Sequence, residues 1–422
     1  MNARQGRPPV LARAAIPIPK RTVQRIQRSN DDYLEKKMTD ISKQVMDLNA
    51  GWYNVVRQAL NLDENTFQLA QGTLALASTD SSGLFLISNA VPPVSAVAHY
   101  DASGLSSRAS AYDMLLHALR GEGGNTLQTA LGDQYAKWIA YRDADTSSLT
   151  QLQLFQKWAD RHLDPNKAAA AVTVFKQQAT LPLNVALDAV ANASNRQSFV
   201  DSAGNPYSLY KYSATLDEAQ QAIANGASAD IAFDSQSMNT SLSHVWVEGA
   251  ASGFYDIFSA GARGSFDQLN TKAASSRLSI EGHIGSFATL ATQPGAWFTS
   301  SEFSRAYSAK NDNTVWTPGA SAGNWDSFFS QPNGSLARRV SQLVLVSDYK
   351  ISVTSHASYS ASDQQTITAA AEFGIWPFFS ASAKSSVTTG TTINNDGSLT
   401  VTYTLNKGLV QIWGVTVQNA PN

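Results

Sequence analysis

The segment Gly319-Ala320-Ser321-Ala322-Gly323 matches the G-x-S-x-G spacing of a serine nucleophile. Such a serine reacts only when it lies on a sharp turn between a buried strand and a helix. Here the match follows Thr317-Pro318 and precedes Asn324-Trp325, within a long polar stretch. A chain rich in Gly, Ala and Ser produces this spacing by chance, so we do not expect a serine hydrolase.

The histidines do not form a metal site by their spacing. None of the six has the H-x-x-x-H or H-x-H arrangement; they are His99, His117, His162, His244, His283 and His356. Asn394-Asn395-Asp396-Gly397 has the residue types of a calcium loop but no acidic ligand at the required downstream position. A hairpin turn explains these four residues. We therefore expect no metal and no cofactor.

An aromatic motif occurs twice in the second half of the chain. Residues 253–263, GFYDIFSAGAR, recur as residues 374–384, GIWPFFSASAK, at an offset of 121 positions. Five of the eleven positions are identical, and the register continues to Leu278 and Leu399 without a gap. The period is too long for a solenoid repeat. We interpret the pattern as two related β-rich units and expect the two copies to have the same local structure.

Carboxylates in the second half could still converge in space as a glycosidase pair; the candidates are Glu248, Asp256, Glu281 and Glu302. The repeat does not preserve them, because Glu248 aligns with Ala369 and Asp256 with Pro377. No catalytic constellation emerges from the sequence. We therefore interpret the protein as non-catalytic.

Aromatic side chains are what the two copies of the motif share. The run Ile375-Trp376-Pro377-Phe378-Phe379 has too many consecutive bulky residues for one face of a strand, so some must point outward. Packing in the core of each unit is the alternative. Outward rings beside Arg263 or Lys384 suit a membrane interface, a sugar or a protein partner. The candidate contact residues are Tyr255, Phe258, Trp376, Phe378 and Phe379.

The first half of the chain is predicted to be mostly helical. A stripe with steps of four and three residues indicates a helix from about residue 34 to residue 59; it contains Leu34, Met38, Ile41, Val45, Leu48, Trp52, Val55 and Ala59. Apolar spacing predicts further helices over 106–119, 127–139 and 152–159. Asp164-Pro165 starts another helix, and Thr215 with Glu218 forms a capping box.

Residues 74–98 are atypical, because they are small and apolar with Asp80 as their one charge and Pro92-Pro93 as a break. We favour an inner helix over residues 83–94. A membrane-entering hairpin is the alternative.

From about residue 230 onward the sequence has β character. Residues 231–422 contain 22 charged side chains, against 42 in residues 1–230, and alternation with period two appears. Strands are predicted at 340–346, 350–354, 399–405 and 409–417, and Asp396-Gly397 predicts a type I′ hairpin turn. The fold class is α+β, a helical N-terminal domain followed by a mostly antiparallel β domain of two related units. The predicted parts are a basic arm (1–29), an α-helical domain (30–230) and two β units (231–335 and 336–422).

Composition limits the partners of the protein. A net charge of -2 gives no electrostatic support for nucleic-acid binding. The chain contains no cysteine, which excludes disulfides, thiolate metal sites and a cysteine nucleophile. The first 29 residues carry seven basic side chains and no acidic one, interrupted by prolines. We therefore expect neither a signal peptide in these residues nor an ordinary transmembrane helix elsewhere in the chain. We expect a soluble protein, with release or non-classical secretion as its route to a target.

Two hypotheses for function follow from these patterns. The first is a membrane-active, toxin-like and pore-forming protein that self-associates on a target membrane. It depends on the low-charge alternating β region, which resembles pore-lining strands, and on the aromatic motifs. The alternative is a glycan-binding or protein-binding, self-assembling structural protein with duplicated β units. In that case tryptophans of the second half would serve as stacking platforms for surface glycans; they are Trp297, Trp316, Trp325 and Trp413.

Overall fold

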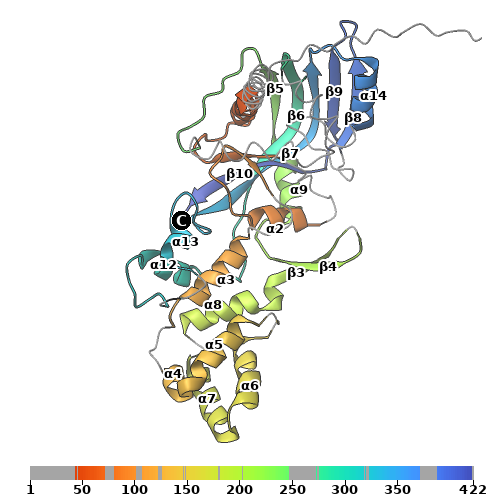
Figure 1. Ribbon diagram of the computed structural model, residues 1–422. Coiled ribbons are helices and arrows are strands. Elements are labelled where there is room, and N and C mark those ends of the chain that lie inside the picture. The colour runs from red at the N-terminus through yellow and green to blue at the C-terminus, as the bar shows by residue number, and fades with distance from the viewer. Residues whose placement is uncertain are drawn as a thin grey trace, which may run out of the picture.

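The protein has an α+β architecture in which a large, mainly antiparallel sheet lies at one end and a group of helices at the other (Figure 1). The computed structural model describes residues 43–44, 46–71, 80–100, 107–121, 126–145, 147, 149–178, 181–201, 203–246, 272, 275–317, 319, 323–370 and 387–420. Helices dominate the N-terminal half, and the long strands belong to the C-terminal half, as the periodicity predicts.

The large sheet draws strands from both halves of the chain. Its order is β2 (Val97–His99), β1 (Phe67–Gln71), β10 (Gln411–Asn419), β7 (Arg338–Ser355), β6 (Leu278–Ala291) and β5 (Ala227–Asp234). β9 (Leu399–Leu405) also pairs with β7, and β8 (Val387–Ile393) pairs with β9. The pairings are antiparallel except for that of β1 with β2.

β7 is long enough to pair with two different strands along the same edge. Its first half pairs with β10 and its second half, from Tyr349 to Ser355, with β9. The change of neighbour coincides with Asp348, which has a positive φ of 53°. Gly285 of β6 lies opposite, where a Cβ atom would come within 2.6 Å of the Asp348 carboxylate. Glycine is therefore required where the two strands approach closely.

The predicted hairpin at Asp396-Gly397 is confirmed, because Ile393 of β8 pairs with Leu399 of β9. The predicted type I′ turn is wrong. The connection spans residues 394–398 and has a positive φ at Gly397 alone, whereas a type I′ turn needs it at two residues. Asn394 accepts the amide hydrogen of Gly397, and its own amide donates to Ser398. These bonds stabilise a longer loop.

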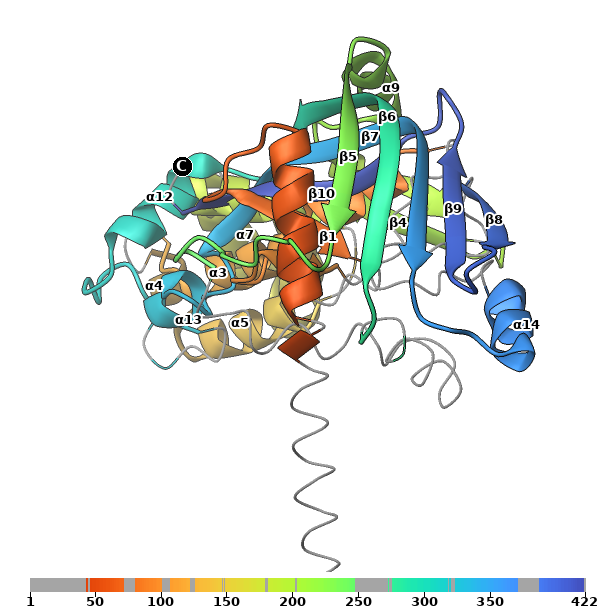
Figure 2. The same ribbon diagram turned by 90° about the horizontal axis from the view of Figure 1, so that it is seen from above.

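A helix of residues 46–59 packs on the large sheet, as Figure 2 shows from above. The predicted stripe residues Leu48 and Trp52 are buried, and the Trp52 ring contacts Phe233 and Trp413. α2 (Ser82–Ser88) and α9 (Leu216–Ala224) join the same core. This core contains residues from both sides of position 230, and the predicted domain boundaries remain predictions.

The helix expected over residues 83–94 is shorter than predicted. α2 ends at Ser88, and the chain continues without helix through Pro92-Pro93. Leu84, Phe85 and Ile87 are all buried. The apolar residues of α2 therefore pack within the protein, which is the inner position that we favoured from the sequence.

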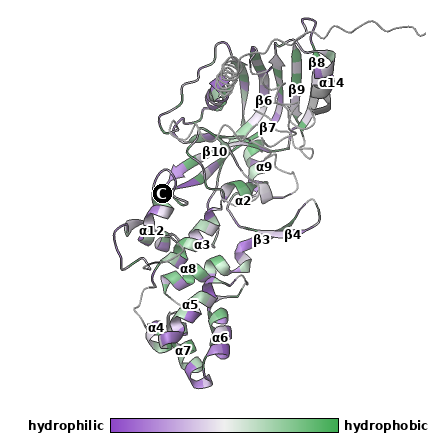
Figure 3. Ribbon diagram, in the orientation of Figure 1, coloured by the Kyte–Doolittle hydropathy of each residue, from purple (hydrophilic) through white to green (hydrophobic). Residues whose placement is uncertain are grey.

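A second core surrounds Trp297, which is fully buried. Its elements are α3 (Arg108–Ala118), α8 (Pro182–Ala191), the hairpin of β3 (Arg196–Val200) and β4 (Pro206–Tyr210), α12 (Ser300–Ser308) and α13 (Trp325–Phe329). α8 consists mostly of apolar residues, shown green in Figure 3, and it contacts α3 and α12 of this core on one hand and α6 of the remaining helices on the other.

The helical lobe, residues 126–178, has a core of its own (Figure 1). It consists of α4 (Thr126–Leu131), α5 (Tyr135–Asp143), α6 (Gln151–His162) and α7 (Pro165–Gln178). The ring of Trp138 contacts Phe155, Trp158 and Phe175. Residues 127–139, expected as one helix, form two, because Gly132 has a positive φ of 54° at a 3-10 turn.

Candidate functional site

Four strand ends form a single row at one end of the large sheet. Leu278, the first residue of β6, pairs with Ser355, the last residue of β7, and Ser355 also pairs with Leu399, the first residue of β9. Asp234, the last residue of β5, pairs with Ser279 beside them. We call this the strand-end row.

Two connections of equal length leave the strand-end row. Residues 235–277 join β5 to β6, and residues 356–398 lie between β7 and β9. Each connection contains 43 residues, and the second one includes β8, which pairs with β9. The boundaries of the two connections differ by the same 121 positions as the motifs. Adding 121 to the number of Asp234 gives Ser355, and adding 121 to that of Leu278 gives Leu399. In sequence the two aromatic motifs stand at the same distance from these boundaries, but the second is followed by β8, whose first residue, Val387, pairs with Leu405 at the end of β9 away from the row.

The described parts of the two connections touch through an ion pair. Lys272 Nζ lies 2.8 Å from Asp363 Oδ2, and the ammonium is 5.1 Å from the centre of the Tyr359 ring. The Tyr359 hydroxyl is 2.7 Å from Ser355 Oγ, which lies 3.2 Å from Ser276 Oγ. These contacts fasten both connections to the strand-end row.

Asp363 also lies in the first turn of α14 (Ala361–Ala370), which lies beside β8 in Figure 1. Its carboxylate accepts the amide hydrogen of Ser360, and Ser360 Oγ accepts that of Asp363. The hydrogen bond from Lys272, followed by those from Ser360, lowers the pKa of Asp363 to about 2. Asp363 is therefore charged at any physiological pH and holds Lys272 and the start of α14 together.

A second, exposed ion pair lies at the β5–β6 side of the strand-end row. Arg277 donates two hydrogen bonds to Asp234 Oδ2, at 3.0 and 2.6 Å. Hydrogen bonding by Arg277 lowers the pKa of Asp234. The pair connects the last residue of β5 to the residue before β6, so it fixes where the first connection leaves the sheet.

The residues predicted to contact a membrane or ligand are not placed by this structure. Tyr255 and Phe258, and Trp376, Phe378 and Phe379, lie outside the described residues. The local structures of 253–262 and 374–383 lie outside them as well, so their predicted similarity stays a prediction. Sequence reasoning missed the fastening residues Lys272, Tyr359 and Asp363, because nothing local marks residues 91 positions apart as partners.

The tryptophans considered as stacking platforms are used for packing. Trp297 and Trp413 are buried, and the Trp297 indole donates to the carbonyl of Lys211. Trp316 stacks on Phe328. The face of Trp325 is covered by Lys310, 4.3 Å from the ring centre. The interpretation of Trp297 and Trp413 as sugar platforms is therefore wrong, because burial leaves their faces inaccessible.

The carboxylates suspected of forming a catalytic pair do not meet among the described residues. Glu302 is buried and bonded to Arg305 at 2.6 Å, whereas Glu281 is exposed on β6. Glu248 and Asp256 lie outside the described residues. His283 is exposed as expected and bonds Asp230. The part of the chain that the structure describes contains no cluster of His, Asp and Glu suited to a metal ion.

Comparison with known proteins identifies no relative. No family model matches the chain, and no curated protein or solved structure matches it either. Over the described ranges, every helix is too short or too polar to cross a bilayer.

Proposed function

We propose that this is a non-catalytic, membrane-active protein of the pore-forming, toxin-like kind. One observation carries the proposal: two 43-residue connections with related sequences leave the same row of strand ends. In the membrane-bound state the first connection would form two strands that prolong β5 and β6, and the second, after β8 leaves β9, would form two strands that prolong β7 and β9.

Hydrogen bonding favours this route into a membrane. A spanning segment must pair all of its backbone groups internally, so a β structure can cross only as part of a continuous ladder. The β6–β7 and β7–β9 ladders already run to the strand-end row. Added strands would therefore continue an existing register and need no new nucleus. Half of each connection exceeds the roughly 9–11 residues that a membrane strand requires.

The polar face of β9 shows the side-chain chemistry that such strands need. Leu399, Val401, Tyr403 and Leu405 are buried on one face, and threonines alternate with them. Thr400 and Thr402 hydrogen-bond Thr354 and Ser352 of β7, at 2.8 and 2.9 Å. One apolar and one hydroxyl-rich face is the pattern of a pore wall, and it is equally that of a half-buried sheet. The pattern supports the proposal together with the paired connections.

Self-association is part of the proposal. Among the described strands of the large sheet, β2, β5 and β8 each pair with a single neighbour. β5 lies on one side of the sheet and β2 and β8 lie on the other, so edge-to-edge addition of copies through β5 and β8 is heterologous and builds a ring when the rotation closes. A ring of copies would bring their connections together on one membrane.

Dye release from liposomes of several compositions, with sizing of the protein before and after lipid exposure, tests this function. Trp376→Ala and Phe379→Ala should abolish release with unchanged thermal stability if these rings meet the membrane. Buried rings would instead lower stability, by about 3–5 kcal/mol. The proposal fails if the wild-type protein neither binds nor permeabilises any composition. Retention on an immobilised glycan in that case would favour the binding-protein alternative.

A further inference from the structure

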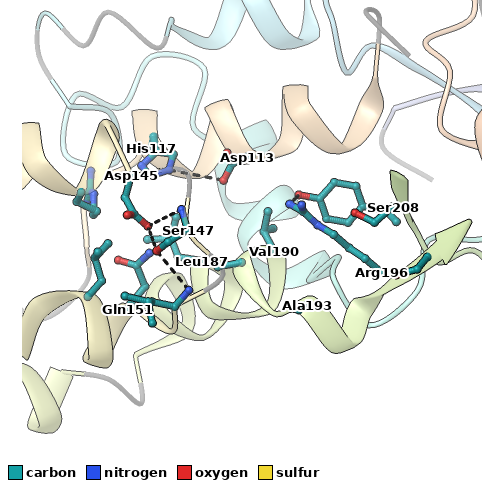
Figure 4. A pocket seen from close by; sticks show the side chains of 16 residues that line it. Asp113, His117, Asp145, Ser147, Gln151, Leu187, Val190, Ala193, Arg196 and Ser208 are labelled. Carbon is teal, nitrogen blue, oxygen red and sulfur yellow. Dashed lines mark hydrogen bonds and ion pairs between the residues drawn. The ribbon is translucent and has the colours of Figure 1, made fainter. Parts of the chain in front are cut away.

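A polar cavity lies between the helical lobe and the β3–β4 hairpin (Figure 4). These elements lie far from the strand-end row (Figure 1). Its volume is about 330 Å³. Leu187 and Val190 of α8 lie in its middle, with Asp145 to one side and Arg196 to the other (Figure 4). Lobe, hairpin and α8 thus build the cavity from segments that are distant in sequence.

Most of the charges around the cavity already neutralise one another. Arg142 lies 2.8 Å from Asp143. His117 lies between two carboxylates, with Nε2 3.5 Å from Asp113 and Nδ1 3.2 Å from Asp143. When His117 is protonated, the two cations and two carboxylates of this group balance one another.

Arg196 presents a cation that no carboxylate neutralises. Its Nη2 donates to the Tyr210 hydroxyl at 2.6 Å, and its guanidinium carbon lies 4.4 Å from the centre of the Tyr210 ring. No ion pair to Arg196 occurs within the described part of the chain. The pairs Arg196 with Tyr210 and Ser198 with Ser208 stand two residues apart on the hairpin, and all four residues line the cavity. One hairpin face thus combines a guanidinium with three hydroxyl groups.

Asp145 presents the opposite charge from the lobe side. Its Oδ2 atom accepts hydrogen bonds from the amide and the hydroxyl of Ser147, at 3.2 and 2.7 Å. These bonds hold the carboxylate in the loop between α5 and α6. Across the described ranges no Lys, Arg or His forms an ion pair with it. Two opposite charges therefore face one cavity without meeting.

We propose that this cavity binds a small zwitterion of the aminoalkyl phosphate class. The phosphate would lie at Arg196, where a guanidinium fork and serine hydroxyls match its acceptor oxygens. The ammonium would lie at Asp145, and the short alkyl link would cross Leu187 and Val190. Free aminoalkyl phosphates and the phosphoethanolamine headgroup of a lipid share this chemistry. The site does not depend on the membrane activity proposed above.

Calorimetric titration with O-phosphoethanolamine tests the assignment, with inorganic phosphate and ethanolamine as half-ligands. We expect O-phosphoethanolamine to bind at least about tenfold more tightly than either half, since each charged contact adds a charge-assisted hydrogen bond. Arg196→Gln and Asp145→Asn should each weaken binding by about tenfold or more. Arg161→Gln and Asp164→Asn change exposed charges of the lobe away from the cavity and serve as matched controls.

Outcomes of the titration separate the alternatives. Equal binding of phosphate and O-phosphoethanolamine, or an Asp145→Asn variant with unchanged affinity, would overturn the zwitterion assignment. Absence of any heat with the wild-type protein would overturn the site itself. A second experiment measures co-sedimentation of the protein with vesicles that contain or lack phosphatidylethanolamine. Co-sedimentation only with phosphatidylethanolamine vesicles, abolished by Arg196→Gln, identifies the ligand as a lipid headgroup. Binding of free O-phosphoethanolamine without such co-sedimentation identifies a soluble ligand. Dye release is measured separately, so failure of the pore-forming proposal is visible by itself.

Discussion

Removing the hydroxyl group of Tyr359 should accelerate membrane permeabilisation. This hydroxyl lies 2.7 Å from Ser355 Oγ at the end of β7, and both side chains are buried. Tyr359→Phe keeps the ring that packs under Lys272 and deletes the bond that fastens the second connection to the strand-end row. The substitution therefore loosens the connection without removing its apolar contacts.

The size of the effect follows from a single hydrogen bond. A buried neutral hydrogen bond contributes about 1 kcal/mol to stability, and about 1 kcal/mol changes a two-state population roughly fivefold. If release of this connection limits insertion, the rate of dye release should rise by about fivefold. Tyr349→Phe is the matched control, because the buried Tyr349 hydroxyl bonds Gln411 at 2.8 Å within the sheet.

Both variants should lose about 1 kcal/mol in free energy of unfolding, measured with urea. Only Tyr359→Phe should release dye faster from liposomes at equal protein concentration. Equal rates for Tyr359→Phe and the wild type, at a stability lowered as expected, would refute a role for this contact in opening. A matching acceleration by Tyr349→Phe would attribute the effect to general destabilisation.

Three further outcomes are expected. Lys272→Asp should raise the permeabilisation rate, and the double variant with Asp363→Lys should restore the wild-type rate; persistence of the fast rate in the double variant would argue against the ion pair. Trp138→Ala should cost the helical lobe about 3–5 kcal/mol, seen as an earlier melting step by circular dichroism, because the ring is buried among aromatics. Burial alone lowers the pKa of His117, but its two carboxylates outweigh burial and raise it. The stabilisation is therefore present below about pH 6.5 and is lost as pH rises through the raised pKa, and His117→Asn should flatten this dependence of the unfolding free energy.

Local sequence patterns predict the helices and strands whose conformation is determined by residues close together in the chain. The capping boxes at Thr150 and Thr215 start α6 and α9, although only the second was foreseen. Asp164-Pro165 starts α7. The alternation from Leu399 to Leu405 appears as strictly alternating burial. Helix caps and strand alternation depend on neighbours within a few residues, so the sequence shows them directly.

Pairing between distant segments was not visible in the sequence. β1 and β2, from the helical half of the chain, extend the sheet beside β10. The sequence does not predict this pairing, because hydrogen bonds between backbone groups do not require particular residue types. The cavity is another example, since Asp145, Arg196 and Tyr210 meet only after the lobe and the hairpin pack on α8. Single charged residues without a local motif give no signal of a shared site.

The sequence by itself determined that two aromatic motifs stand 121 residues apart and that hydroxyl-rich alternating strands follow them. Only the tertiary structure decided where strands begin and end: the same offset separates the end of β5 from the end of β7 and the start of β6 from the start of β9. The structure also brings these four strand ends together in one row. The reason is that a repeat in sequence records spacing along the chain, whereas the meeting of strand ends depends on the register of hydrogen bonds between strands. Those bonds form between segments brought together by the shared core beneath the sheet.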